Sequence, residues 1–168
     1  MRHGPRYRVK SRRRREGKTD YRKRLKLLRS RKVRVVVRKS LKNTRVQFVE
    51  YDEGGDKIIA SAISNELPTK YQWKYSTATT SAAYLTGLLA GKRAADKGIS
   101  ESVLDTGRHT PITGSKLFAA LKGIVDAGIA CPYNEEKLPS EERILGEHLN
   151  KDIKPAVTEI KSKIIGGK

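Results

Sequence analysis

Arginine and lysine are concentrated at the start of this chain, and their positive charge is the clearest indication of function in the sequence. Residues 1–45 hold 21 Lys and Arg against two acids, whereas the other 123 residues hold 16 against 16. The whole formal charge of +19 therefore lies in the first quarter of the chain. Adjacent cations repel one another and become favourable when a dense polyanion supplies the counter-charge. Nucleic acid is the commonest such polyanion, so the segment predicts a nucleic-acid contact.

Aromatic residues are interleaved with these cations. Tyr7 and Tyr21 lie among the arginines, and both aromatic rings and guanidinium planes stack on unpaired bases. Packing of Tyr21 on the body of the protein is an equally good interpretation. Trp73 lies between lysines in a second aromatic and cationic stretch, where it could contact nucleic acid or cap one end of the core.

The residues that we expect to contact nucleic acid fall in three segments. They are, in the N-terminal segment, Arg6, Tyr7, Arg8, Lys10, Arg12, Arg13, Arg14, Arg15, Lys18, Thr19, Tyr21, Arg22 and Arg24; in the second stretch, Lys70, Trp73 and Lys74; and in a later loop, Arg108 and His109.

Two short motifs partly match known functional motifs, but each lacks residues that the corresponding chemistry requires. Asp105-Thr106-Gly107 matches the aspartic protease triplet, whose chemistry needs two carboxylates that share a proton. Only one copy is present, so a symmetric dimer would be required. In Gly87–Lys92 only three residues separate the glycines and no Ser or Thr follows the lysine, which excludes a phosphate-binding loop.

Metal and thiol chemistry are not indicated either. The three histidines lie in different segments without ligand spacing, and Asp52, Glu53 and Asp56 surround a Gly-Gly pair that favours a solvated hairpin tip. Cys131, the only cysteine, excludes a disulfide and is best interpreted as a buried structural thiol. We therefore expect no enzyme, no metal and no cofactor.

The periodicity of the chain predicts an α/β fold. Residues 1–18 lack a hydrophobic period, which indicates an extended arm. Residues 19–31 are predicted to form a short helix that is capped by Thr19 or Asp20. Leu25 and Leu28 of this helix are expected to face inward. Strand-like runs occur at 34–38, where three valines are flanked by arginines, at 45–51, where apolar residues alternate with others, and at 57–63. Short turns join them into an antiparallel three-strand meander.

The second half of the chain predicts a crossover. After a loop over 64–76, a helix over 77–97 and a strand over 102–105 favour a right-handed crossover that places the last strand parallel to a neighbour. A helix over 116–127, capped by Ser115, follows, and then a polar tail with helices over 141–150 and 156–165. The expected fold is a compact mixed β-sheet packed with helices.

Three parts are therefore expected: a basic arm that binds nucleic acid, with a short helix (1–31), an α/β domain (32–135) and a polar helical C-terminal tail (136–168). No apolar run approaches the roughly 18 residues of a membrane span, and no apolar stretch follows the basic start as in a signal peptide. A cytoplasmic location is expected.

Two stretches together resemble a known family. RRRREGKTDY at Arg12–Tyr21, followed by RKRLKLL and VVVRKS, and AYLTGLLAGKRA, followed by VLDTG and TPITGSKLFAALKGIVDAGI, are similar to the large-subunit ribosomal proteins numbered eighteen in the universal scheme. The likeness covers most of residues 5–135, is closest to the archaeal branch, and weakens after about residue 140.

The resemblance implies a structural protein of the large ribosomal subunit that binds 5S ribosomal RNA and attaches it to large-subunit RNA in the central protuberance. It implies neighbouring ribosomal proteins as partners, among them the 5S-binding universal protein five, and neither a membrane nor a homo-oligomer. The rival is a DNA-binding or chromatin-type protein with a basic arm, although no helix-turn-helix, zinc site or dimerising heptad appears.

Overall fold

The computed structural model describes residues 4–150 and 152–166, and its centre is a four-stranded mixed sheet. Strands β1 (Arg34–Lys39), β2 (Thr44–Glu50) and β3 (Lys57–Ile63) form the predicted antiparallel meander. Strand β4 (Val103–Asp105) adds to β1 in parallel, which gives the order β3-β2-β1-β4. The predicted fold class is confirmed.

The two faces of the sheet differ because side chains alternate along each strand. Val35 and Val37 of β1 and Phe48 of β2 are fully buried on the helix-covered face. The intervening residues of β1, Arg34 and Arg38 among them, project to the opposite face. We call this second side the open face of the sheet.

Two helices cover the buried face. The crossover helix α4 (Thr80–Ala95) contacts β2 and β3, and α5 (Lys116–Asp126) contacts α4 and β1. Glycines let these helices approach closely, since a Cβ added at Gly87 would lie 2.0 Å from the carbonyl oxygen of Ala120. Ser115 precedes α5 as predicted, but its hydroxyl makes no capping hydrogen bond.

The predicted loop over 64–76 is wrong in part, because it contains helix α3 (Glu66–Tyr71). Pro68 belongs to a residue type that is typical of loops. It lies in the first turn of α3, where backbone N–H groups have no partner within the helix and proline is tolerated. The helix ends at Gln72, which adopts a left-handed conformation with φ of 56°.

The C-terminal helices differ in extent from the prediction. A 3₁₀ turn (Glu135–Lys137) precedes helix α6 (Glu141–Leu145), which ends early because Gly146 turns the chain with φ of +77°. Helix α7 (Ile153–Gly166) starts before the predicted residue 156 and packs on α4. Among the apolar residues of the tail, Ile160 and Ile164 are buried, Leu145 is partly buried and Leu149 is exposed.

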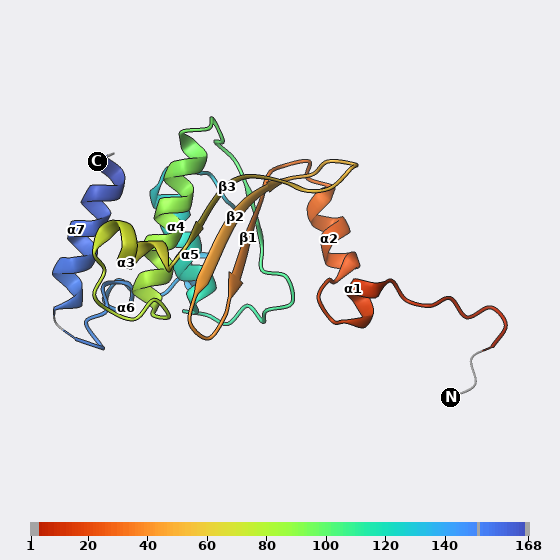
Figure 1. The fold of residues 1–168 in the computed structure, drawn as a ribbon, viewed down its shortest axis with the longest axis horizontal. Helices are drawn as coiled ribbons and strands as arrows, with labels where there is room; N and C mark the ends of the chain where they lie inside the picture. The colour runs from red at the N-terminus through yellow and green to blue at the C-terminus, as the bar shows by residue number, and fades with distance from the viewer. Residues whose placement is uncertain (1–3, 151, 167–168) are drawn as a thin grey trace.

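The N-terminal segment forms two short helices rather than one. Helix α1 (Arg12–Arg15) corrects the prediction of an extended arm through residue 18, and α2 (Tyr21–Leu28) lies within the predicted helix. Arginine is a good helix former, and the pair between Arg12 and Glu16 joins successive turns. In Figure 1, α1 and α2 stand on the side of the sheet away from α4, α5 and α7, and the preceding residues extend outward.

Candidate nucleic-acid interface

Helix α2 starts where its sequence supplies a cap. The carboxylate of Asp20 accepts hydrogen bonds from the backbone N–H groups of Arg22, at 3.0 Å, and Lys23, at 3.2 Å. These bonds, that of Lys23 foremost, hold the pKa of Asp20 below its usual range. Of the two predicted caps, Asp20 is therefore the one used. Thr19 instead accepts a hydrogen bond from the Arg13 guanidinium at 2.9 Å, which ties α1 to the start of α2.

Two cations of α2 attach the helix to the body of the protein. The guanidinium of Arg24 makes two hydrogen bonds of 2.8 Å to the carboxylate of Asp56, next to the β2–β3 turn. The ammonium of Lys23 donates to the hydroxyl of Thr106 at 2.7 Å and to the carbonyl of Gly107 at 3.0 Å. The apolar contact is small, since Leu25 is 57% exposed and does not face inward as predicted. Polar contacts therefore do most of the docking.

Beneath α2, two arginines of β1 converge on two carboxylates. Arg34, only 2% exposed, pairs with Asp56 at 2.8 Å and with Asp105 at 3.2 Å. Arg38 pairs with Asp105 at 3.3 Å and donates to its backbone carbonyl at 2.7 Å. The hydrogen bonds from Arg24 and Arg34 lower the pKa of Asp56. The hairpin tip is exposed as predicted, but the carboxylate of Asp56 is held by two arginines instead of being free in solvent.

The turn after β4 completes this junction. Gly107 adopts φ of +59°, and a Cβ there would lie 2.8 Å from the guanidinium carbon of Arg38. Arg108 lies against the arm, since a Cβ added at Gly17 would meet its guanidinium at 3.1 Å. Burial, with the nearby charges of Lys39 and Arg38, lowers the pKa of His109, so this ring is neutral near pH 7. The predicted Arg108 and His109 thus adjoin the N-terminal cations.

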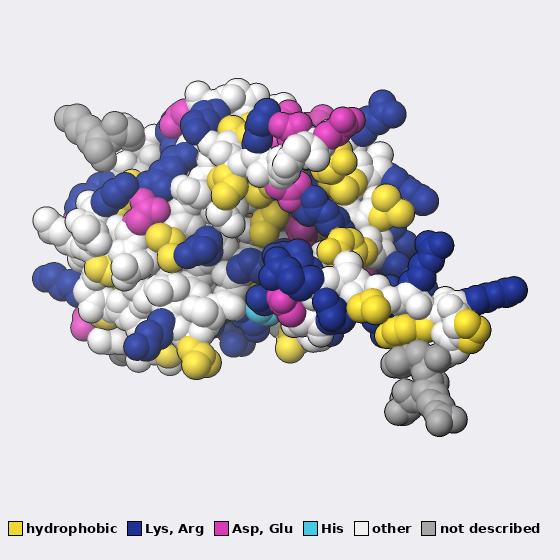
Figure 2. Space-filling model, turned by 45° about the vertical axis from the view of Figure 1, so that its right-hand side comes forward, with side chains coloured by type: hydrophobic (Ala, Val, Ile, Leu, Met, Phe, Trp, Pro, Cys, Tyr) yellow, Lys and Arg dark blue, Asp and Glu magenta, His cyan; other side chains and the backbone are white. Residues whose placement is uncertain are grey.

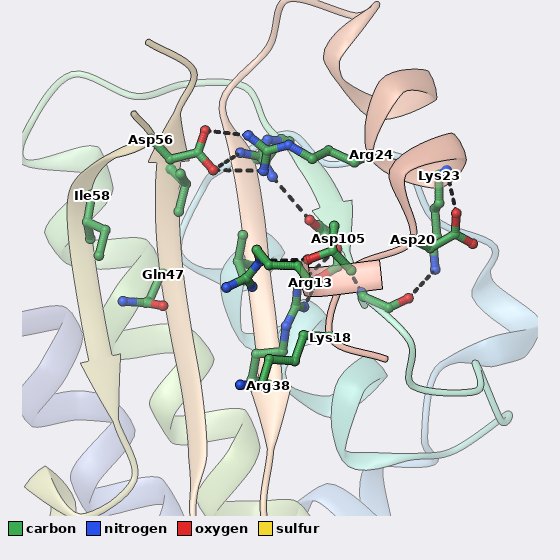
Figure 3. A pocket seen from close by; sticks show the side chains of 15 residues that line it. Arg13, Lys18, Asp20, Lys23, Arg24, Arg38, Gln47, Asp56, Ile58 and Asp105 are labelled. Atoms are coloured by element: carbon green, nitrogen blue, oxygen red, sulfur yellow. Dashed lines mark hydrogen bonds and ion pairs between the residues drawn. The ribbon is translucent and has the colours of Figure 1, made fainter. Parts of the chain in front are cut away.

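These elements enclose a cavity of about 340 Å³ between α2 and the open face of the sheet, which we call the sheet-face pocket (Figure 3). Its lining includes six Lys or Arg and three Asp side chains. Figure 2 shows Lys and Arg side chains gathered around this part of the surface, with acidic side chains among them. The lining residues are Arg13, Lys18, Thr19, Asp20, Lys23, Arg24, Arg34, Val36, Arg38, Gln47, Val49, Asp56, Ile58, Asp105 and Gly107.

The structure brings many of the predicted contact residues to this region. Arg13, Lys18, Thr19 and Arg24 line the pocket. Exposed residues of the arm and its helices lie beyond it: Arg6, Tyr7, Arg8, Lys10, Arg12, Arg14, Arg15, Tyr21 and Arg22. The arm therefore offers a continuous run of solvent-accessible cations.

The second predicted segment does not join them. Trp73 is 3% exposed in the main core, and its ring nitrogen donates to the carbonyl of Ser76. The alternative, a cap on one end of the core, is confirmed, and Trp73 is withdrawn as a contact residue. Lys70 pairs with Glu66 at 2.9 Å, and Lys74 is exposed beside Trp73. Figure 1 places α3 by α7, far from α1 and α2.

Sequence reasoning missed three cations of the pocket, Lys23, Arg34 and Arg38. A signal was present in β1, where Arg34, Val36 and Arg38 alternate with the two buried valines. That alternation places both arginines on the face away from the core. Gln47, the cross-strand partner of Val36, shares that face.

The described residues contain no group of three or more His, Cys, Asp or Glu side chains able to hold a metal ion. Cys131 is buried, and burial raises the pKa of its thiol, as expected of a structural cysteine. His3 lies outside the described residues. Among the described helices, none has the length and apolar character needed to cross a membrane.

Comparison with known proteins agrees with the sequence resemblance. The family described as ribosomal large subunit proteins 60S L5 and 50S L18 matches residues 5–102, more than half of the chain. The large ribosomal subunit protein uL18 of Aeropyrum pernix is 54% identical over 149 residues, which cover 89% of this chain and 70% of that protein. The uL18 protein of Korarchaeum cryptofilum is 56% identical over 144 residues, covering 86% and 73%. These archaeal relatives are ribosomal structural proteins and not enzymes. The chain therefore belongs to the family of large-subunit ribosomal proteins that contains 60S L5 and 50S L18.

Proposed function

We propose that this protein binds 5S ribosomal RNA and helps to attach it to large-subunit ribosomal RNA in the central protuberance. The observation that carries the proposal is the location of the charge. All of the net positive charge lies in residues 1–45, and α1 and α2 hold part of it beside the open face of the sheet. Family membership selects ribosomal RNA among the possible polyanions.

The arrangement fits structured RNA better than duplex DNA. A-form RNA hides the base edges of its major groove, so proteins recognise its backbone, its shape and its unpaired bases. The arm supplies exposed guanidinium groups for phosphates, and Tyr7 and Tyr21, 49% and 41% exposed, can stack on unpaired bases. The neutral remainder of the chain then sets the position of the RNA and is free to contact neighbouring ribosomal proteins, among them the universal protein five.

A binding competition tests the proposal. Labelled 5S rRNA and a DNA duplex of equal length are captured on filters by the full-length protein over a range of salt concentrations. We expect the 5S rRNA to remain bound at salt that releases the DNA, because electrostatic attraction alone is lost as salt rises. Equal retention of both would contradict the proposal and favour the alternative of a DNA-binding or chromatin-type protein.

Removal of the arm separates its role from that of the body. A variant that starts at residue 19 keeps Asp20, Lys23 and Arg24, and with them the cap and both attachments of α2. We expect it to fold, as judged by circular dichroism, and to bind 5S rRNA at least 100-fold more weakly, because it loses nine Lys or Arg residues. Unchanged affinity would show that the body carries the site.

A further inference from the structure

The sheet-face pocket has features that general phosphate binding does not require. We propose that it holds a single unpaired nucleotide of the bound RNA, with the base on the open face of the sheet and its phosphate at the cationic rim. The inference rests on the proposed function and deepens it, because it names the element of the RNA that this cavity recognises.

The floor of the pocket is apolar and suits a flat base. Val36 lies on β1 beside Gln47 of β2, and Val49 of β2 lies beside Ile58 of β3. A β-bulge between Phe48 and Val49 shifts the register so that Ile58 stands opposite Val49. Ile58 is 56% exposed, so an apolar surface stays uncovered inside a cavity surrounded by charge. A nucleobase covers such a surface without losing hydrogen bonds at its edge.

The amide of Gln47 stands on this floor (Figure 3). Within the described part of the chain, it is only partly exposed and no side-chain hydrogen bond engages it. A primary amide carries both a donor and an acceptor, as do the edges of the bases, and base edges are read by such side chains. A bare phosphate would leave the acceptor half of this amide unused.

Cations outnumber carboxylates at the rim, where Lys18 already pairs with Glu16 and Arg38 with Asp105. Six Lys or Arg side chains line the pocket against three carboxylates, and the buried Nε of Arg34 has no partner among the described residues. Lys18 at the rim is 60% exposed, and Arg38 is 40% exposed. A phosphate at the solvent side supplies further acceptors to these two cations, which are accessible there.

The size of the cavity limits its occupant. Small-molecule sites in proteins span about 300–1,000 Å³, and this pocket, at about 340 Å³, is at the lower end. That volume suits one nucleotide, whereas a base-paired helix would have to lie outside on α1 and the arm. Recognition of a splayed-out base is also the usual route to sequence specificity in RNA.

Chemical probing of the RNA bases tests the inference. The full-length protein is bound to 5S rRNA, and reagents that modify the Watson–Crick edges of unpaired bases report which bases are covered. Three proteins are compared at saturating concentration: the unchanged chain, Gln47→Leu, and Ser61→Val as the matched control. Ser61 is exposed, is the cross-strand partner of Gln47, and does not line the pocket.

We expect one unpaired base to be protected by the unchanged chain and by Ser61→Val, and to regain its reactivity with Gln47→Leu while all other protections persist. Loss of one or two hydrogen bonds should weaken binding about 5- to 10-fold. Identical protection with Gln47→Leu would overturn the inference and leave RNA binding intact. The absence of any protection with the unchanged chain would overturn both the proposed function and the inference.

A second measurement does not depend on the RNA complex. The side-chain amide signal of Gln47 in the NMR spectrum, assigned by its loss in Gln47→Leu, is followed as nucleoside 5′-monophosphates are added. At least one of the four should shift it, and ribose 5-phosphate should not. Equal shifts with ribose 5-phosphate or with an acidic peptide would overturn the assignment of a base to the floor of the pocket.

Discussion

The guanidinium of Arg24 in α2 faces the carboxylate of Asp56 beside the β2–β3 turn, and two hydrogen bonds of 2.8 Å join them. The same carboxylate also holds Arg34 of β1 at 2.8 Å. One acidic side chain thus connects the N-terminal helix to the central sheet, and the arm starts from a fixed position.

Asp56→Asn should loosen α2 at Arg24 and also weaken the contact with the buried Arg34, which keeps Asp105 as its partner. The pair with Arg24 is partly exposed, with side-chain exposures of 29% and 28%, so we expect a local cost of about 1–2 kcal/mol, between those of surface and buried pairs. Hydrogen exchange of the α2 amides should accelerate about 5- to 30-fold. Asp52→Asn is the control, because Asp52 lies in the same turn and pairs with the exposed Lys57 instead of with α2. Equal exchange in both variants would show that α2 is held by other contacts.

Asp105→Asn should destabilise the whole domain. The Asp105 side chain is 10% exposed and accepts hydrogen bonds from Arg34, Arg38 and the backbone N–H of Gly107. Removing its charge leaves the buried Arg34 with Asp56 alone, and breaking a buried pair costs about 3–5 kcal/mol. Urea unfolding measures this loss. Asp96→Asn, at a residue that is 59% exposed, should cost less than about 0.5 kcal/mol. A similar cost for the two variants would contradict this account of the junction.

Gly87→Ala should push α4 and α5 apart. The added Cβ would lie 2.0 Å from the carbonyl oxygen of Ala120, which is backbone and has little room to move. Overpacking of this kind costs about 1–3 kcal/mol and sometimes more, so the midpoint of thermal unfolding should fall by several degrees. Gly54→Ala, where the new methyl group meets nothing within 4 Å, should leave the midpoint nearly unchanged. An unchanged midpoint in Gly87→Ala would mean that α4 and α5 lie further apart at Gly87 than the structure indicates.

The ion pair of Glu66 should make stability depend on pH. Arg93 foremost, and then Lys70, lower the pKa of Glu66 from 4.5 to about 2. Because the folded pKa is the lower one, the stabilisation is complete above about pH 4.5 and is lost as the pH falls towards 2. Glu66→Gln should therefore cost about 2 kcal/mol at pH 7, after an allowance for solvent screening, and almost nothing at pH 2.

Denaturant unfolding between pH 2 and 7 measures this difference. Glu53→Gln is the control, since Glu53 is exposed in the β2–β3 turn and should show no pH-dependent difference from the unchanged chain. A constant gap between Glu66→Gln and the unchanged chain at every pH would show that the carboxylate charge is not the source of the stability.

Local patterns in the sequence predicted most of the sheet. Alternating apolar residues and short turns define β1 to β3, and the parallel addition of β4 follows from the crossover rule. Errors arose where the prediction of a helix or loop depended on a single residue. Pro68 was interpreted without its place in the first turn of α3, and Gly146 was not recognised as the residue that ends α6.

The sequence predicted the positive charge of the arm but only part of its structure. Net charge identified its chemistry, but the attachment of Arg24 to Asp56 joins residues 32 apart in the chain, and Lys23 meets Thr106 across 83 residues. No local pattern reveals such pairs. For the same reason the sequence did not reveal the arginine partners of Asp56, and it left two interpretations open for Trp73, contact with nucleic acid or a cap on the core.

The salt dependence of 5S rRNA binding tests the central claim, that the N-terminal cations neutralise phosphates of this RNA. Contact with roughly eight phosphates predicts a slope of about −6 to −7 for log K against log salt concentration. Replacing Arg12, Arg13, Arg14 and Arg15 by Gln should reduce the magnitude of that slope by about 3 and leave the fold intact, because all four side chains are exposed. A slope that is the same in both proteins would contradict the account.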